Sequence, residues 1–155
     1  MREIKFRGLN GETGWHYGIP LTNKLGTYII FEKNPHICSQ YHYIEIDEFE
    51  VVKKETVSQW TGLLDKNDVE IYEGDIVKFQ HIDDYGYMTN VFQNGFYRGV
   101  VKWGGYYPAF DIFDIKDNST FDFDCNIFSM ESDIVIEVIG NIYENKELLG
   151  QIWKQ

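Results

Sequence analysis

Apolar and polar residues alternate with a period of two in several short segments of this chain. These segments are rich in β-branched and aromatic residues and are separated by Gly, Asn and Asp, which is typical of β-strands. They lie at 4–6, 44–46, 76–79, 100–103, 121–123 and 134–142. The only helix the sequence predicts is a short one over 146–149, with Asn145 as its N-cap. The chain is therefore predicted to be mostly β, with strongly bent antiparallel sheets.

The segment 59–79 contains three predicted turns. Gly62 can adopt a positive φ, residues 65–68 supply Asx-type turn side chains, and Gly74 lies in a reversal just before a strand. We expect Gly62, Gly74 and Gly140 to be required by the backbone conformation at their positions.

These turns and strands predict an SH3-like barrel in the second part of the chain. A tight turn into the strand 76–79, followed by the strand 99–103, is the layout of such a barrel, and the segment 137–143 is expected to close it. Buried aromatic and aliphatic side chains contribute about 1.5–3 kcal/mol each. The expected core residues are Trp60, Ile71, Tyr72, Val77, Phe79, Val101, Ile139 and Ile142.

The 155 residues of the chain match the usual size of one domain. No Ser- or Pro-rich linker separates halves of different composition. We expect a single domain over 1–155, in which a strand region of about 1–60 packs against a barrel-like region of about 61–155. Hydrophobic residues make up 43% and aromatic residues 17% of the chain, which excludes a disordered acidic protein.

Four blocks of the sequence resemble the YopX family of phage and prophage proteins. They occur in the same order as in the family and reach from one end of the chain to the other: 2–7, 59–77, 99–103, and 138–145 with 147–149. The resemblance implies a β-rich fold, a phage-encoded protein working in bacterial cytoplasm, and no established enzymatic activity. Where the family usually has Asn-Gly, this chain has Asn67-Asp68, and a left-handed Asp in place of Gly should cost about 1 kcal/mol.

Oxygen-bearing side chains in the segment 122–133 have the spacing of a calcium loop. The possible ligands at loop positions 1, 3, 5 and 12 are Asp122, Asp124, Asn126 and Asp133. The sixth position of such a loop needs Gly for its sharp turn and is Ile127 here. We interpret Asp122 and Asp124 as the solvated face of a strand.

His36, Cys38 and His42 are possible zinc ligands, and Cys125 could supply a fourth. The segment lacks a second Cys within four residues and a paired-His motif, so we interpret it as a loop with a buried thiol. Both cysteines are expected to be reduced in a cytoplasmic protein. The other two histidines are isolated and are expected at packing or surface positions: His16 and His81.

The sequence lacks the motifs of nucleophilic hydrolases, metallohydrolases and P-loop enzymes. The glycines in 103–106 are expected to form a hairpin turn. The carboxylate pairs Asp83-Asp84 and Glu73 with Asp75 could serve in acid–base catalysis, but among 25 acidic residues such pairs arise by chance. We assign no catalytic, cofactor-binding or metal-binding residue, and we predict that the protein is not an enzyme.

Twenty-five Asp and Glu against 14 Lys and Arg give a formal net charge of −11, which disfavours nucleic acid and anionic membranes as partners. A nucleic-acid-binding SH3-like barrel is one alternative, because aromatic residues can stack on bases. Its basic residues would be Arg2, Lys5, Arg7, Arg98 and Lys102. A second alternative is an acidic inhibitor that mimics DNA, although the acidity could also serve only solubility and the protection of strand edges.

The favoured function is a non-enzymatic phage or prophage accessory protein that binds a macromolecular partner, namely a host or phage protein, and could also self-associate. The segment 1–7 alternates charged and apolar residues, unlike a secretory signal. No apolar run approaches the ~20 residues of a membrane-spanning helix. We therefore expect a protein of the bacterial cytoplasm without a membrane partner.

Overall fold

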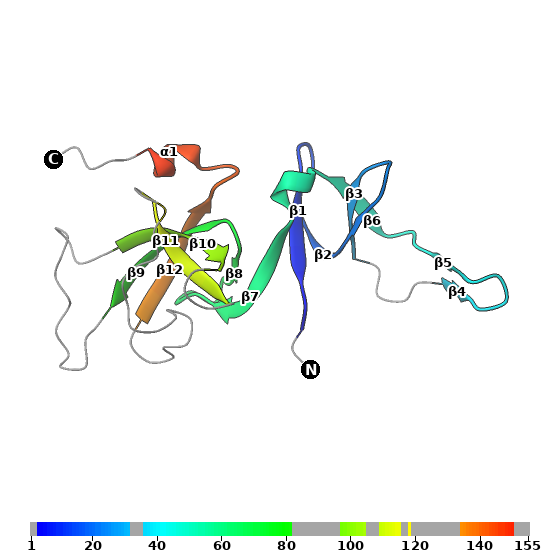
Figure 1. Ribbon diagram of the computed structural model, residues 1–155, viewed down its shortest axis with the longest axis horizontal. Helices are drawn as coiled ribbons and strands as arrows, with labels where there is room; N and C mark the ends of the chain where they lie inside the picture. The colour runs from blue at the N-terminus through cyan, green and yellow to red at the C-terminus, as the bar shows by residue number, and fades with distance from the viewer. Residues whose placement is uncertain are drawn as a thin grey trace. The chain divides into compact units, whose positions relative to one another are not determined.

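The structure is a computed structural model that describes residues 3–31, 36–81, 97–104, 109–115, 118 and 134–150. These residues form antiparallel β-sheets and one short C-terminal α-helix (Figure 1). The elements are β1 (Phe6–Asn10), β2 (Gly14–Thr22), β3 (Thr27–Ile30), β4 (His36–Cys38), β5 (Tyr43–Glu45), β6 (Phe49–Val52), the 3₁₀ turn η1 (Lys54–Thr56), β7 (Ser58–Leu64), β8 (Glu70–Tyr72), β9 (Asp75–His81), β10 (Tyr97–Trp103), β11 (Phe110–Asp114), β12 (Ile134–Asn141) and α1 (Lys146–Leu149). The mostly β prediction is confirmed, and the strand predicted over 121–123 lies outside the described residues.

The chain divides into two compact units, 1–60 and 61–155. In the first unit the strands follow the order β6-β3-β2-β1, and β1 pairs on its other side with the start of β7. Strands β4 and β5 form a separate two-stranded sheet. None of the helices in the described part of the chain has the length and apolar character needed to cross a bilayer.

Strand β2 is long because it changes partners halfway along its length. Residues 14–18 pair with β1, and residues 19–22 pair with β3. Pro20 lies in the second half and so removes no hydrogen bond to β1. At Gly18, where the partners change, a Cβ atom would collide with the carbonyl oxygen of Ile30, so this crossing requires glycine.

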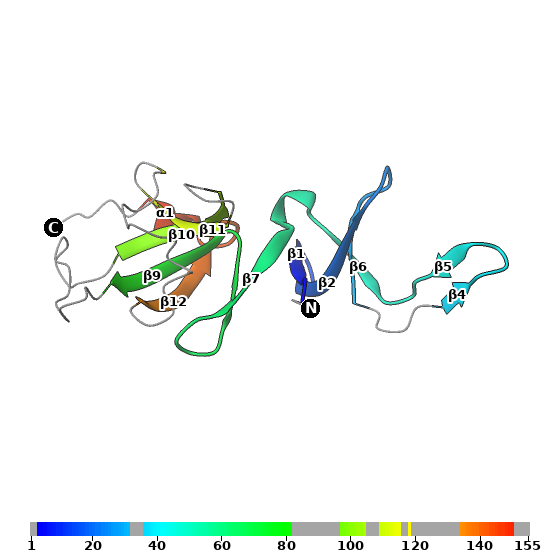
Figure 2. The ribbon, with the colours of Figure 1, turned by 60° about the horizontal axis from the view of Figure 1, so that its bottom comes forward.

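In the second unit the strands of the main sheet follow the order β11-β10-β9-β12 (Figure 2). One face of this sheet forms a buried apolar core with Ile71 of β8; its other members are Val77, Phe79, Val101, Phe110 and Ile112. Half-buried side chains pack around it: Leu63, Tyr97, Ile136 and Val138.

Five of the eight predicted core residues are fully buried: Ile71, Tyr72, Val77, Phe79 and Val101. The other three, Trp60, Ile139 and Ile142, are only half-buried. Ile139 lies at a β-bulge, since Val138 is opposite Val77 and Gly140 is opposite Ile76, and Val138 occupies the core side. Trp60 is large, and such residues are rarely buried completely.

The predicted barrel is not closed by the strands that the structure describes. Strand β12 pairs with β9, and β11 pairs with β10, so the sheet stays open between β11 and β12. The second side of β12 bonds to the turn after β7 instead: Lys66 N donates to Ile136 O (2.9 Å) and Val138 N to Asp65 Oδ2 (3.0 Å). This turn therefore satisfies two of the backbone groups through which β12 would have closed the barrel, the carbonyl of Ile136 and the N–H of Val138.

The C-terminal helix forms over the predicted residues, but Asn145 does not cap it. The Asn145 side chain accepts no backbone N–H of α1 and donates only to the side chain of Glu147, from Nδ2 to Oε1 at 3.4 Å. Asn145 Oδ1 instead accepts a hydrogen bond from Asn141 N at 3.1 Å. The Asn145 side chain can lie against the backbone of β12 because residue 140 is glycine: a Cβ atom on Gly140 would lie 2.5 Å from Asn145 Oδ1.

Candidate functional site

The main candidate site of the described residues is an apolar sheet face in the first unit. The strand register places Ile19, Ile30 and Phe49 in one row across β2, β3 and β6. Leu21, Tyr28 and Val51 form a second row two residues away. Residues directly opposite one another in neighbouring strands share a face, so these six side chains lie together, and we call them the outer face.

On the inner side of the same strands, two apolar side chains are already covered. Ile29 and Val52, which alternate with the outer-face residues, are buried, and Gly8 approaches both of them closely. On the outer face, in contrast, four side chains expose between 45% and 54% of their surface: Ile19, Leu21, Phe49 and Val51. With a full surface of ~200 Å² for a large apolar residue, about 400 Å² of apolar surface is open to solvent. Exposed patches of roughly 300–600 Å² are often functional.

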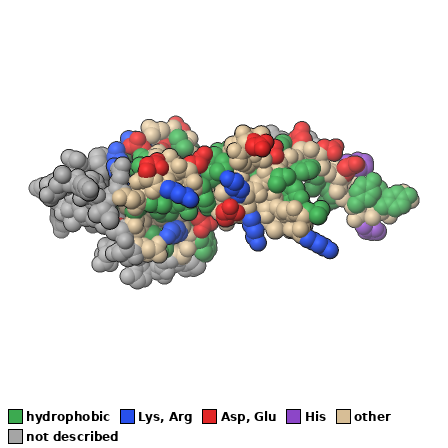
Figure 3. Space-filling view, turned by 90° about the horizontal axis from the view of Figure 1, so that it is seen from above, with side chains coloured by type: hydrophobic (Ala, Val, Ile, Leu, Met, Phe, Trp, Pro, Cys, Tyr) green, Lys and Arg blue, Asp and Glu red, His purple; other side chains and the backbone are tan. Residues whose placement is uncertain are grey.

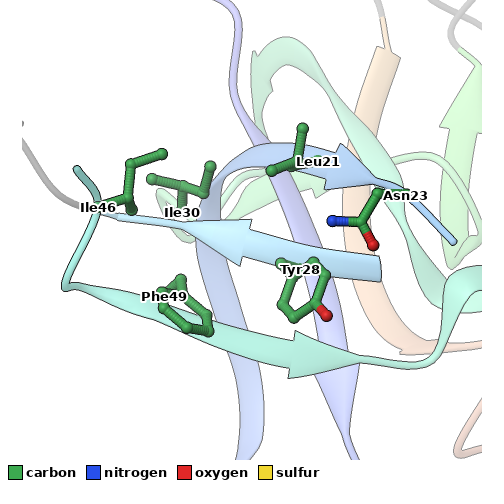
Figure 4. Close-up of a pocket in the computed structure, with 6 residues that line it drawn as sticks. All are labelled: Leu21, Asn23, Tyr28, Ile30, Ile46 and Phe49. Atoms are coloured by element: carbon green, nitrogen blue, oxygen red, sulfur yellow. The ribbon is translucent and has the colours of Figure 1, made fainter. Parts of the chain in front are cut away.

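A shallow hollow of about 210 Å³ lies on the outer face. It is lined by Leu21, Asn23, Tyr28, Ile30, Ile46 and Phe49, which come from three neighbouring strands and the segments beside them (Figure 4). The rings of Tyr28 and Phe49 meet edge to face with centroids 5.6 Å apart. Small-molecule pockets usually measure about 300–1,000 Å³. The hollow is therefore of a size for one or two side chains of a protein rather than for a cofactor.

The possible zinc ligands lie on the β4–β5 hairpin. His36 and Cys38 belong to β4, and His42 lies in the turn with a φ of 57°. Cys38 is a free, half-buried thiol. Within the described ranges, no three His, Cys, Asp or Glu side chains are grouped as metal ligands. Cys125 and the possible calcium ligands at 122–133 lie outside the described residues, as do Asp83 and Asp84.

Glu73 and Asp75 take part in a turn. Asp75 is buried, and its Oδ2 accepts a hydrogen bond from Tyr72 N at 2.8 Å. Between them, Gly74 has a φ of 81°, donates its N–H to Val101 O at 2.8 Å, and accepts a hydrogen bond from Ile142 N at 2.9 Å. Three segments that carry the sequence resemblance therefore meet at this glycine, where they fix the backbone.

Three of the five basic residues suggested for nucleic acid lie against aromatic rings of the protein itself, and Arg98 is half-buried in β10. Lys5 Nζ is 5.4 Å from the centroid of the Tyr17 ring, and the buried Arg7 guanidinium is 4.4 Å from that of Trp15. Lys102 lies over the Phe113 ring and also contacts Asn118 Oδ1. Arg2 lies outside the described residues.

Two buried carboxylates of the second unit have shifted acidities. Burial acts to raise the pKa of Asp65, but backbone N–H donors of Val138, Val69 and Asn67 outweigh it and hold that pKa below its ordinary value. Burial raises the pKa of Asp111, which accepts one bond from the N–H of Ile112. Both carboxylates accept backbone hydrogen bonds within the sheet and its turns.

The acidity of the chain is concentrated in the second unit. Residues 1–60 contain seven Lys and Arg against eight Asp and Glu, a formal charge of −1. Residues 61–155 contain seven Lys and Arg against seventeen Asp and Glu, a formal charge of −10. The outer face therefore belongs to a nearly neutral unit, and an interface there would meet little electrostatic repulsion.

Comparison with known proteins supports the sequence resemblance. The sequence profile of the family described as YopX protein matches residues 5–150. Among solved structures, the chain is similar to the crystal structure of protein EF1440 from Enterococcus faecalis, with 25% sequence identity and a TM-score of 0.54. That similarity covers 96% of this chain and 99% of the other. A comparison with curated proteins gave no match.

Proposed function

The chain belongs to the YopX protein family, and from that premise we propose that it is a non-enzymatic accessory protein of a phage or prophage that binds a protein partner through the outer face. It would act in the cytoplasm of the bacterial host. The observation that carries this proposal is the pair of cross-strand apolar rows, which is half-exposed, whereas Ile29 and Val52 on the inner side are buried. Such a face stabilises a complex when a second surface removes it from water.

The proposal includes an SH3-like arrangement of the second unit. Strands β9, β10 and β11 form an antiparallel meander, and β12 pairs on the far side of β9. The turn after β7 forms hydrogen bonds with β12, and β9 pairs with the other side of this strand, so β12 has hydrogen-bond partners on both sides. These features support a barrel-like shape for this unit.

The binding proposal is tested with a double variant, Ile19→Ser with Val51→Ser, against the control Ile4→Ser. All three side chains are exposed, so the variants should fold, and Ile4 lies outside the outer face. Proteins captured from the bacterial host should remain bound to the wild type and the control at high salt, because an apolar contact is not screened. They should be lost from the double variant. Equal capture by all three proteins would refute the proposal.

The charge division favours one second candidate, a DNA-mimicking inhibitor whose active part is the second unit. Ten excess negative charges in 61–155 would suit the basic DNA site of a host enzyme. This candidate predicts that binding disappears as salt rises, that duplex DNA competes with it, and that the outer-face variant binds as well as the wild type. Retardation of labelled single- or double-stranded nucleic acid by the protein at low salt would instead support the nucleic-acid-binding alternative.

A further inference from the structure

The β4–β5 hairpin, residues 36–45, exposes apolar side chains on both of its faces. Ile37 and Ile44 are directly opposite each other, and Cys38 is opposite Tyr43 on the other face. Four large side chains of the hairpin, Ile37, Tyr41, Tyr43 and Ile44, expose between 48% and 69% of their surface. An isolated two-stranded hairpin is only marginally stable in water, so a covering surface would stabilise this one.

The chemistry of that covering surface follows from the charge of the hairpin. Glu45, at the end of β5, is the one charged residue of the hairpin, although charged residues make up 25% of the chain. Figure 3 shows hydrophobic side chains with histidines beside them at this end of the first unit. A segment of this kind gains little from a charged groove and is best covered by an apolar one.

The outer face is a surface of that chemistry. Its hollow is lined by Leu21, Tyr28, Ile30, Ile46 and Phe49, with Asn23 as the one amide. We propose that the hairpin of one copy docks on the outer face of a second copy, and that the exchange is reciprocal. This inference rests on the proposed function of the outer face as a binding surface, and it names the partner as this same chain.

The areas support a reciprocal exchange. Ile37 and Ile44, which share one face of the hairpin, expose about 250 Å² and the outer face about 400 Å², so one contact would bury roughly 650 Å² in total. One such contact falls among the weak interfaces below ~1,200 Å², whereas two bury about 1,300 Å², within the range of specific interfaces. The formal charge of −1 on the first unit adds little repulsion between two copies.

The test uses the full-length chain in sedimentation equilibrium at ~1–100 µM. One variant, Ile44→Glu, changes the hairpin, and a second, Val51→Glu, changes the outer face. Ile4→Glu, at an exposed position of the same unit outside both surfaces, is the matched control. Circular dichroism establishes that each variant keeps the wild-type fold. We expect the wild type and the control to sediment as dimers of the 18.3 kDa chain, and each of the other two variants alone to sediment as a monomer.

Mixing the two variants distinguishes hairpin docking from every symmetric contact between two outer faces. Val51→Glu retains an intact hairpin and Ile44→Glu an intact outer face, so an equimolar mixture should form a heterodimer through one remaining contact, with affinity at least tenfold weaker than in the wild type. Dimers that neither substitution disrupts, or variants that stay monomeric when mixed, would overturn the inference. A monomeric wild type would also overturn it, while capture of another protein by the outer face would show that the proposed function still holds.

Discussion

Replacing Asp65 with Asn tests how the second unit is held together. The carboxylate is 7% exposed and accepts three backbone hydrogen bonds. Its Oδ1 accepts the N–H groups of Asn67 (2.7 Å) and Val69 (3.0 Å), and its Oδ2 accepts that of Val138 (3.0 Å). The amide of Asn retains one acceptor oxygen but turns NH₂ donors toward the remaining N–H. A hydrogen bond to a charged group contributes about 1.5–3 kcal/mol, so we expect a loss of about 2–3 kcal/mol.

The assay is urea unfolding at pH 7, combined with hydrogen exchange of the Val138 and Val69 amides. Exchange gives a local readout, which is useful because two compact units need not unfold in one transition. Asp68→Asn is the matched control, because it removes one negative charge from the same turn at an exposed residue whose left-handed φ of 63° Asn tolerates. Asp68→Asn should change the unfolding free energy by less than ~0.5 kcal/mol.

The loss of stability in Asp65→Asn should depend on pH. Because the folded-state pKa of Asp65 is lowered, its contribution is fully present above the unfolded value of 3.8 and is lost as the pH falls through the folded-state pKa. The difference between the wild type and Asp65→Asn should therefore shrink below about pH 3.8. A difference that is absent at pH 7, or that grows with acid, would refute this reasoning.

Three further predictions concern single residues. Gly140→Ala should destabilise the protein by about 2–4 kcal/mol in urea unfolding, because the new Cβ meets Asn145 Oδ1. The control Gly14→Ala has a φ of 91° but no atom within 4 Å, and it should cost only about 1 kcal/mol. Equal costs for the two variants would argue against the contact. The folded-state pKa of Asp111 is raised above the unfolded value of 3.8. Lowering the pH from above this folded-state pKa toward 3.8 should therefore stabilise the wild type relative to Asp111→Asn. Parallel pH profiles of the unfolding free energy for the two proteins would contradict this. Asp68→Gly should raise the melting temperature, since it relieves up to about 1 kcal/mol of left-handed strain; an unchanged or lower value would show that Asp is accommodated without strain.

The sequence predicts the parts of the fold that depend on local interactions. Strands β9, β10 and β12 follow from β-branched residues in alternation, and the turn at Gly74 and the left-handed Asp68 follow from their residue types. Strand β2 was missed because Gly18 and Pro20 interrupt its pattern. Pro20 is compatible with the strand only because β2 changes partners there, and this is a property of the tertiary arrangement.

The outer face was also missed, although the sequence contains a signal for it. Strands β3 and β6 carry apolar residues on both faces: Ile29 alternates with Tyr28 and Ile30, and Val52 follows Val51. Strands of this kind are typical of sheets that are covered on both sides. The sequence does not show which side the chain covers itself, because that depends on how Gly8 lets β1 approach Ile29 and Val52.

The uneven charge of the two units has a practical consequence for immobilised protein. A cationic surface, such as an anion-exchange resin or an amine-coated sensor, would capture the chain chiefly by residues 61–155, which carry ten excess negative charges. The unit 1–60, whose formal charge is only −1, would then be left free in the mobile phase. Attachment by charge alone would orient the molecule for binding measurements without a tag.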